Sequence, residues 1–201
     1  MSEPERGARR LDPATRRAAI LASARIAFAS RPYAQVSLAA VGRDAGVSEA
    51  LVHKYFDGKA GLFAELTQEA VDLLLTAQAE AQAALPPGSS RRDRVRTSLL
   101  VHLDHVASHP AGWAAPLMGS ADDPEAARAV RQAATQQHVA LLQELLGGRQ
   151  DLRSHYAIHG YLGHVQAACL SWSQRGCPDE ERWPLVEAAL GALEGALGDW
   201  G

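Results

Sequence analysis

The 201-residue sequence predicts an all-α fold, on three observations. Alanine and arginine, which favour helices, are abundant, whereas the β-favouring residues valine, isoleucine, phenylalanine and tyrosine are sparse. Apolar residues recur every three or four positions in several long stretches, as they do on one buried face of a helix. No segment alternates like a strand. The length suits either one domain or a small domain followed by a larger one.

The first helix is expected to begin at Asp12 and Pro13, because aspartate is a good N-cap and proline fits the first helical position. Its apolar face continues to Phe28, and Arg31-Pro32 stops it. Residues 1–11 before it are charged and have no apolar core, so they do not form a secretory signal. We expect them to be a disordered arm.

Two short helices are expected to meet at a glycine within residues 37–63. Ser37 is a candidate N-cap for the first, Gly46 supplies the left-handed residue that ends it, and Ser48 caps the second. This is the helix-turn-helix arrangement, whose second helix enters the major groove of DNA. The residues of that helix expected to point outward are Glu49, Ala50, His53 and Lys54.

A run of matching positions supports that interpretation: Ala39-Ala40-Val41, Asp44-Ala45-Gly46-Val47-Ser48, Val52 to Phe56, and Gly58-Lys59. Together they resemble the DNA-binding domain of the tetracycline-repressor (TetR) family, over roughly residues 14–66. The resemblance implies a three-helix DNA-binding domain at residues 1–58. It also implies a helical ligand-binding and dimerisation domain at residues 59–201.

The charge distribution agrees with DNA binding at one end of the chain. Residues 1–60 hold ten Lys or Arg and six Asp or Glu, a net charge of +4, whereas the whole chain carries −3. The arm of residues 1–11 is expected either to follow DNA or to be a solvated tail. The resemblance and these charges give the expected DNA contacts: Ser37, Ser48, Glu49, Ala50, Leu51, His53, Lys54, Tyr55, Lys59, Arg16 and Arg17.

Three of these contacts have competing interpretations. Glu49 stands where many relatives carry a basic or neutral residue; it can accept from a cytosine amino group but is repelled by phosphate. Leu51 is expected either against a thymine methyl group or in the core. Lys59 lies at a helix N-terminus, where free N–H groups and the helix dipole favour a phosphate. The alternative is a surface lysine, but the resemblance matches a position where the family contacts backbone phosphate, so we expect Lys59 to bind one.

Five further helices are expected after the motif: at about residues 59–84 and 91–108, from Asp122-Asp123-Pro124 to Gly147-Gly148, at about residues 151–175, and a last one after Gly176-Cys177-Pro178-Asp179 that bears Trp183 to Leu197. An irregular stretch follows His109. The last two helices are apolar over more than one narrow stripe and contain Gly160, Gly163, Gly191 and Gly195. Since glycine costs a helix ~1 kcal/mol relative to alanine, close packing of helices would offset it. We expect a homodimer through these two helices, as in the family; the alternative is packing within one subunit.

A small-molecule pocket is implied by the resemblance, enclosed by the helices that start near residues 91, 124 and 151. The candidate lining residues are large and semi-polar: His102, His105, Trp113, Met118, His138, Tyr161, Gln166 and Trp172. For each of them core packing is the alternative. An apolar cavity with a few polar groups suits a hydrophobic or aromatic effector.

Histidine spacing raises a metal site as an alternative. His102, His105 and His109 fall at i, i+3 and i+7, and His155 with His159 at i, i+4, but no HExxH motif or matching carboxylate accompanies them. No enzyme motif is present, and the two cysteines suit a reducing compartment. We therefore expect no enzymatic activity, metal or cofactor.

The expected function is a cytoplasmic, homodimeric transcriptional regulator. We expect it to act as a repressor that binds a palindromic operator in double-stranded DNA and is released by a small-molecule effector. No stretch is apolar enough to span a membrane. Two alternatives stay open: a metal-dependent helical enzyme, and a small-molecule-binding protein with a vestigial DNA-binding head.

Overall fold

The structure, a computed structural model, describes residues 12–108, 119, 122–148, 151–198 and 200. These residues fold into helices without any strand, so the all-α prediction is confirmed. The helices are α1 (Pro13–Ser30), the 3-10 helix η1 (Tyr33–Gln35), α2 (Leu38–Asp44), α3 (Glu49–Phe56), α4 (Gly58–Ala83), α5 (Arg91–Ser108), α7 (Glu125–Leu145), α8 (Leu152–Gln174) and α9 (Asp179–Leu197).

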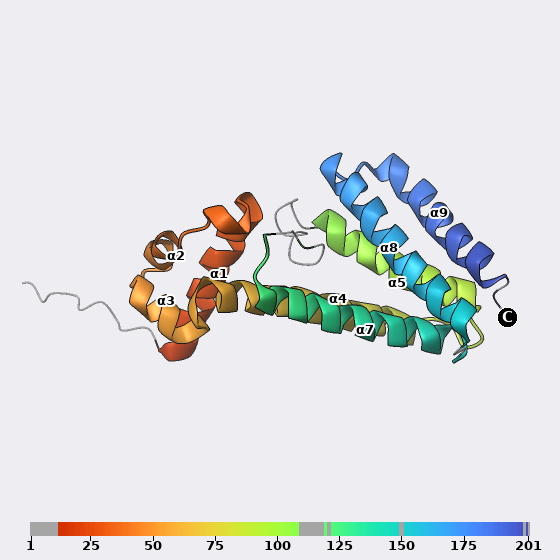
Figure 1. The fold of residues 1–201 in the computed structure, drawn as a ribbon, viewed down its shortest axis with the longest axis horizontal. Coiled ribbons are helices and arrows are strands. Elements are labelled where there is room, and N and C mark those ends of the chain that lie inside the picture. Colours follow the sequence, from red (N-terminus) through yellow and green to blue (C-terminus); the bar gives the residue numbers. More distant parts are fainter. Residues whose placement is uncertain (1–11, 109–118, 120–121, 149–150, 199, 201) are drawn as a thin grey trace, which may run out of the picture.

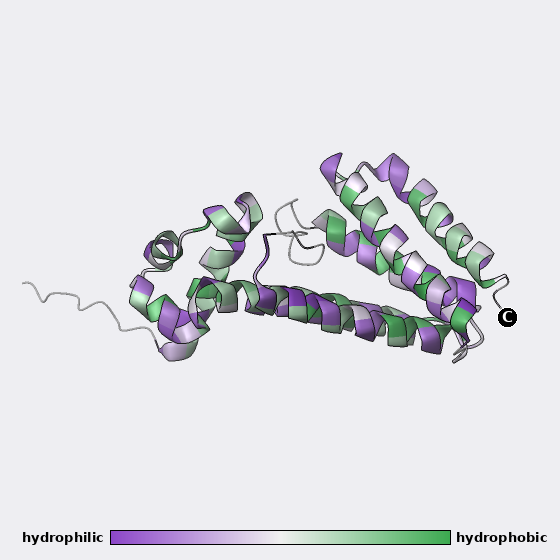
Figure 2. Cartoon of the chain, in the orientation of Figure 1, coloured by the Kyte–Doolittle hydropathy of each residue, from purple (hydrophilic) through white to green (hydrophobic). Residues whose placement is uncertain are grey.

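The helices divide into a small head and a larger body (Figure 1). Helices α1, α2 and α3 form the head with the first turns of α4, and α5, α8 and α9 stack on the far half of α4 and α7. In α9 the first turn is hydrophilic and the remainder mostly hydrophobic (Figure 2). Within the described residues, no helix is both long and apolar enough to cross a membrane.

Each part has its own hydrophobic core, and α4 and α7 extend along both. The head core joins α1, α2 and α3 to Leu62, Phe63 and Leu66 of α4, and it includes Ala127 of α7. The body core joins α5, α8 and α9 to Leu142 of α7 and its neighbours. Side by side, α4 and α7 therefore run from the head into the body (Figure 1).

Three of the expected helix ends in the head are confirmed, whereas Ser37 stands at the N-cap position of α2 without a capping hydrogen bond from its side chain. The Asp12 carboxylate accepts from the backbone N–H groups of Ala14 and Thr15, both at 3.0 Å, and so caps α1. Gly46 has a φ of +69° after α2, the left-handed conformation that glycine adopts freely. The Ser48 hydroxyl then accepts from the Leu51 N–H at 3.3 Å and caps α3.

The junction between α3 and α4 is closed tightly by a glycine. Asp57 joins the two helices in a left-handed conformation, with φ of +51°. One turn into α4, a Cβ atom at Gly61 would lie 1.9 Å from the carbonyl oxygen of Phe56. Only glycine at residue 61 lets the end of α3 approach α4 this closely, and the approach fixes the angle between the two helices.

Gly61→Ala is expected to destabilise the protein by about 2–3 kcal/mol, although alanine favours helices, because the new methyl group collides with backbone. Thr76→Ala on the exposed face of the same helix is the matched control and should change stability little. Urea unfolding of both variants measures the difference. Equal stability of the two variants would show that the junction relaxes without cost.

Candidate functional site

The exposed face of α3 is the first candidate site. Val52 and Phe56 are buried in the head core, whereas Glu49, Ala50, His53 and Lys54 are exposed. The outward face expected from the sequence is therefore confirmed as a surface. Leu51 and Tyr55 are half-buried at its edges, and Ser37 and Ser48 are exposed at the starts of α2 and α3.

Glu49 has a structural function within α3. Its carboxylate lies in the first turn, where a negative charge interacts favourably with the helix dipole. It also lies 4.0 Å from Nε2 of His53, one turn later. Because both side chains are more than half exposed, this pair contributes little to stability. It does reduce the basic character of the exposed face.

Arg17 ties three helices of the head together. Its guanidinium on α1 forms an ion pair with Glu65 of α4 and lies 5.1 Å from the centroid of the Phe56 ring on α3. Arg16, the residue before it, is half-buried. The contacts of Arg17 hold α1 against α3 and α4, so a phosphate would have to compete with Glu65 for this side chain.

Lys59 is directed into the protein. Its ammonium donates to the carbonyl oxygens of Tyr33, Ala34 and Val36 at 3.0, 3.3 and 3.1 Å. It also lies 4.5 Å from the centroid of the Tyr33 ring. An ammonium has three N–H donors, and these three carbonyl groups match them. A phosphate contact, expected from the sequence, would require Lys59 to give up these bonds.

Lys59→Met is expected to lower the free energy of unfolding by about 1–2 kcal/mol, because three carbonyl groups lose a charged donor. Lys54→Met, the other lysine of the chain, is exposed and should leave stability unchanged within about 0.5 kcal/mol. Thermal and urea unfolding provide the measurement. Similar stability for both variants would mean that Lys59 is free to bind DNA.

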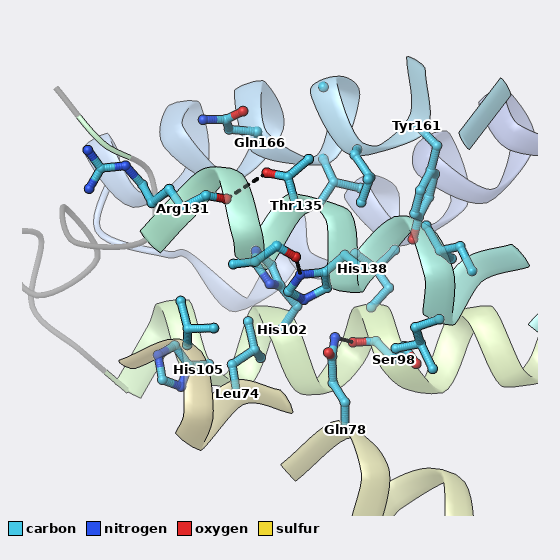
Figure 3. Close-up of a pocket in the computed structure, with 18 of the residues that line it drawn as sticks. Leu74, Gln78, Ser98, His102, His105, Arg131, Thr135, His138, Tyr161 and Gln166 are labelled. Carbon is cyan, nitrogen blue, oxygen red and sulfur yellow. Dashed lines mark hydrogen bonds between the residues drawn. The ribbon is translucent and has the colours of Figure 1, made fainter. Parts of the chain in front are cut away.

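A cavity of about 440 Å³ in the body is the second candidate site. It lies between α4, α5, α7 and α8, and Figure 3 shows polar side chains from all four helices around it. Its volume falls within the usual range for small-molecule sites. Much of its lining is apolar, including Leu74, Leu99 and Leu142.

Most of the candidate pocket residues line this cavity: His102, His105, His138, Tyr161 and Gln166. Trp172 does not. It is buried in the body core, where its indole N–H donates to the Pro178 carbonyl at 3.0 Å, so its role is to join α8 to the start of α9. The candidates Trp113 and Met118 lie outside the described residues.

Sequence reasoning missed the contribution of α4 to the cavity. Gln78 lies four residues after Leu74 on the buried stripe of this helix, and its amide NH₂ donates to the Ser98 carbonyl at 3.0 Å. A glutamine that continues an apolar stripe is the signal that could have identified it. Arg131 was also missed; it lines the cavity and forms an ion pair with the buried Asp123 at 2.6 Å.

Two histidines of the cavity, His102 and His138, have lowered pKa values. Burial lowers the pKa of His102 to about 4, with further lowering from the nearby His138 and His105. Burial also lowers the pKa of His138, although its hydrogen bond to the Ala134 carbonyl opposes this. At neutral pH these two side chains are therefore imidazole rings rather than imidazolium cations.

Acid is expected to destabilise the fold through His102. An unfolded chain protonates this residue near pH 6.5, whereas the folded chain resists protonation until about pH 4. Stability present above pH 6.5 is therefore lost as the pH falls from 6.5 to 4. His102→Gln removes the titrating group, so urea unfolding at pH 7.5 and 4.5 should show a smaller loss in the variant. Parallel losses would contradict the assignment.

The metal alternative gains no support from the part of the chain that the structure describes. There, no three His, Cys, Asp or Glu side chains converge in a way that could hold a metal ion. The rings of His155 and His159 lie close, with centroids 4.5 Å apart, but they form only a pair. His109, the third member of the other group, lies outside the described residues.

Comparison with protein families identifies the head. Residues 20–66, from the middle of α1 into α4, match the family described as "Bacterial regulatory proteins, tetR family". This stretch contains the whole of α2 and α3 and the junction at Gly61. A search of curated proteins gives no match.

Solved structures share the fold over nearly the whole chain. A putative transcriptional regulator from Pseudomonas aeruginosa PAO1 has a TM-score of 0.75 at 19% identity, over 92% of this chain and 93% of that one. A TetR-like transcriptional regulator from Rhodococcus sp. RHA1 has a TM-score of 0.70 at 22% identity, over 94% and 100%. The regulator FadR from Bacillus subtilis, in complex with stearoyl-CoA, has a TM-score of 0.69 at 15% identity, over 90% and 97%.

Proposed function

We propose that this chain is a transcriptional regulator of the TetR family, and that it binds a palindromic operator as a homodimer, represses transcription, and leaves the DNA when a small molecule fills the cavity in its body. One observation carries this proposal. The cavity is walled by α4 and α7, the two helices that also pack into the core of the head. A ligand between them acts directly on the elements that position α3.

In the DNA complex, each subunit places α3 in a major groove. The exposed face of this helix then meets base edges through Glu49, Ala50 and Leu51, and phosphates through His53, Lys54 and Tyr55. Ser37, Ser48 and Arg16 lie around the same face and complete the contact. We assign Arg17 and Lys59 mainly to holding α3 in place, since their charged groups are already engaged inside the head.

The dimer forms through α8 and α9. Large apolar side chains are exposed on these helices, at Leu152, Tyr156, Leu170 and Trp183. A Cβ atom added at Gly160, Gly163, Gly191 or Gly195 would have nothing within 4 Å in the same subunit. Packing within one chain therefore gives no reason for these glycines, whereas close approach of a partner's helices does.

The ligand signal reaches the head along two helices. In α4, Val71 and Leu74 line the cavity, while Leu66 and Ala70, one turn earlier, belong to the head core. In α7, Ala134 and His138 line the cavity and Ala127 belongs to the head core. A ligand that changes the spacing of α4 and α7 therefore tilts the head. The head then has two orientations, and operator affinity falls by the ratio of the ligand's affinities for the protein in these two orientations.

A polar contact reinforces the route along α7. Arg131 at the cavity forms its ion pair with Asp123, just before this helix, and Asp123 is 5% exposed. Asp123 lies close enough to Tyr33 in the head for its charge to raise the pKa of the phenol, after the larger effect of burial. The stearoyl-CoA complex of FadR supports ligand control in this fold, although 15% identity transfers no ligand to this chain.

DNA from the region upstream of the chain's own gene should bind the protein with two subunits per site. Lys54→Ala should weaken binding and reduce the slope of log affinity against log salt by about 1, because it removes one cation from a phosphate, and His53→Ala should weaken binding because it removes a hydrogen bond to phosphate. Arg175→Ala, an exposed cation paired with Glu181 on the body, is the control and should change neither. Fluorescence anisotropy at several salt concentrations measures both quantities.

Failure of the upstream DNA to bind would favour the alternative of a small-molecule-binding protein with a vestigial head. Unchanged affinity in both His53→Ala and Lys54→Ala, together with an unchanged salt dependence in Lys54→Ala, would show that this face of α3 does not contact phosphate. Binding by one subunit at a time would contradict the proposed dimer.

A further inference from the structure

Whether the unpaired polar atoms of the cavity are hydrogen-bond donors or acceptors restricts the ligand that the cavity accepts. Two polar atoms of the lining, His138 Nε2 and Gln78 Oε1, are buried and have no hydrogen-bond partner in the described part of the chain. A buried polar group without a partner costs about 1–3 kcal/mol, so its presence in a cavity indicates a ligand that supplies the missing bond. Which groups are missing, donors or acceptors, decides the chemistry of that ligand.

His138 presents an acceptor. Its Nδ1 lies 2.8 Å from the Ala134 carbonyl oxygen, and since a carbonyl only accepts, Nδ1 carries the proton. In a neutral imidazole the other nitrogen, Nε2, then has a lone pair and no proton. This Nε2 is buried and has no hydrogen-bond partner. The low pKa that burial gives His138 keeps the ring in this form at neutral pH.

Gln78, on α4, presents a second acceptor. Its NH₂ group is fixed by donation to the Ser98 carbonyl, which leaves the side-chain oxygen Oε1 as the free end of the amide. Oε1 is buried and has no partner. The two acceptors therefore come from different helices that line the cavity, Gln78 from α4 and His138 from α7 (Figure 3).

The remaining polar groups do not call for an anion. Apart from the histidines, Arg131 is the one charged residue among the described lining residues, and it is paired with Asp123. Figure 3 shows its guanidinium directed away from the other labelled side chains. A carboxylate or phosphate would face two lone pairs and a neutral His102, and it would lose its hydration without gaining a counter-charge.

We propose that the ligand of this cavity is an uncharged, mainly apolar molecule with O–H or N–H groups that donate to His138 Nε2 and Gln78 Oε1, such as an alkylated polyphenol. The inference rests on the proposed function, in which this cavity is the effector site. It adds the chemical class: a hydrogen-bond donor that is not an anion and also not a cation, since the described lining residues include no carboxylate to pair with one. The apolar part of the molecule lies against Leu74, Leu99 and Leu142.

A matched series of probes tests the class on the full-length dimer by calorimetry. 4-Hexylresorcinol has two O–H donors, its dimethyl ether has none, 4-hexylbenzoate is an anion and 4-hexylbenzylamine is a cation. The resorcinol should bind about tenfold or more tightly than the ether, as expected for the loss of donors to buried acceptors. It should also bind more tightly than both ions. Tightest binding by either ion, or equal binding of resorcinol and ether, would overturn the proposal.

Variants assign the acceptors. His138→Phe and Gln78→Leu should each weaken binding of the resorcinol about tenfold while leaving that of the ether nearly unchanged. Gln132→Leu, at an exposed residue of the same cavity, is the matched control and should preserve the preference. Loss of the preference in the control as well, or its survival in both acceptor variants, would contradict the assignment. The probe series on unmodified protein does not depend on the folding of any variant.

DNA binding measured on the same samples separates the two proposals. If the protein binds upstream DNA but no probe, the donor class is wrong and the regulator remains. If the resorcinol binds with the expected preference but DNA does not bind, the donor inference stands and the operator function fails.

Discussion

The extension of α4 and α7 from the core of the head to the cavity in the body is the constraint on which the rest of the structure depends. Leu66 of α4 and Ala127 of α7 are completely buried in the head, while later residues of the same helices wall the cavity and enter the body. Since protein interiors are close-packed, neither helix moves at one end without a response at the other. The cavity lies where that response is easiest to produce, because a void leaves the neighbouring side chains without contacts.

Within the head, charged side chains that lie away from the exposed face of α3 fix the orientation of this helix. Arg17 and Lys59 use their cationic groups on Glu65 and on three carbonyl oxygens, and both also lie over aromatic rings. Part of the positive charge that the sequence concentrates in its first 60 residues therefore holds α3 in place and is not presented on its surface. The exposed face of α3 has Glu49 beside His53 and opposes the charge of Lys54 with that of Glu49.

Local patterns were sufficient to predict the helices and the exposed face of α3, because caps, glycines and apolar spacing act within a few residues. Asp12, Gly46 and Ser48 all behave as those patterns indicate. Local patterns could not predict the contacts of Lys59, since the carbonyl groups that it contacts lie 23 to 26 residues earlier in the chain. Trp172 and Gln78 show the same limit: both are buried, and only the packing of helices decides which of them reaches the cavity.

The burial of Ala127 in the core of the head has a consequence for chimeric proteins in which the head is exchanged. The natural cut for a chimera is Gly58, where the sequence divides the head from the body, but a transplanted head would meet α7 of the host at Ala127 and Asp123. A donor head whose surface at this contact has a different size or shape would either fail to pack against α7 or would pack in a different orientation. Exchanging the start of α7 together with the head would preserve this contact, so the modular unit consists of two separate stretches of sequence.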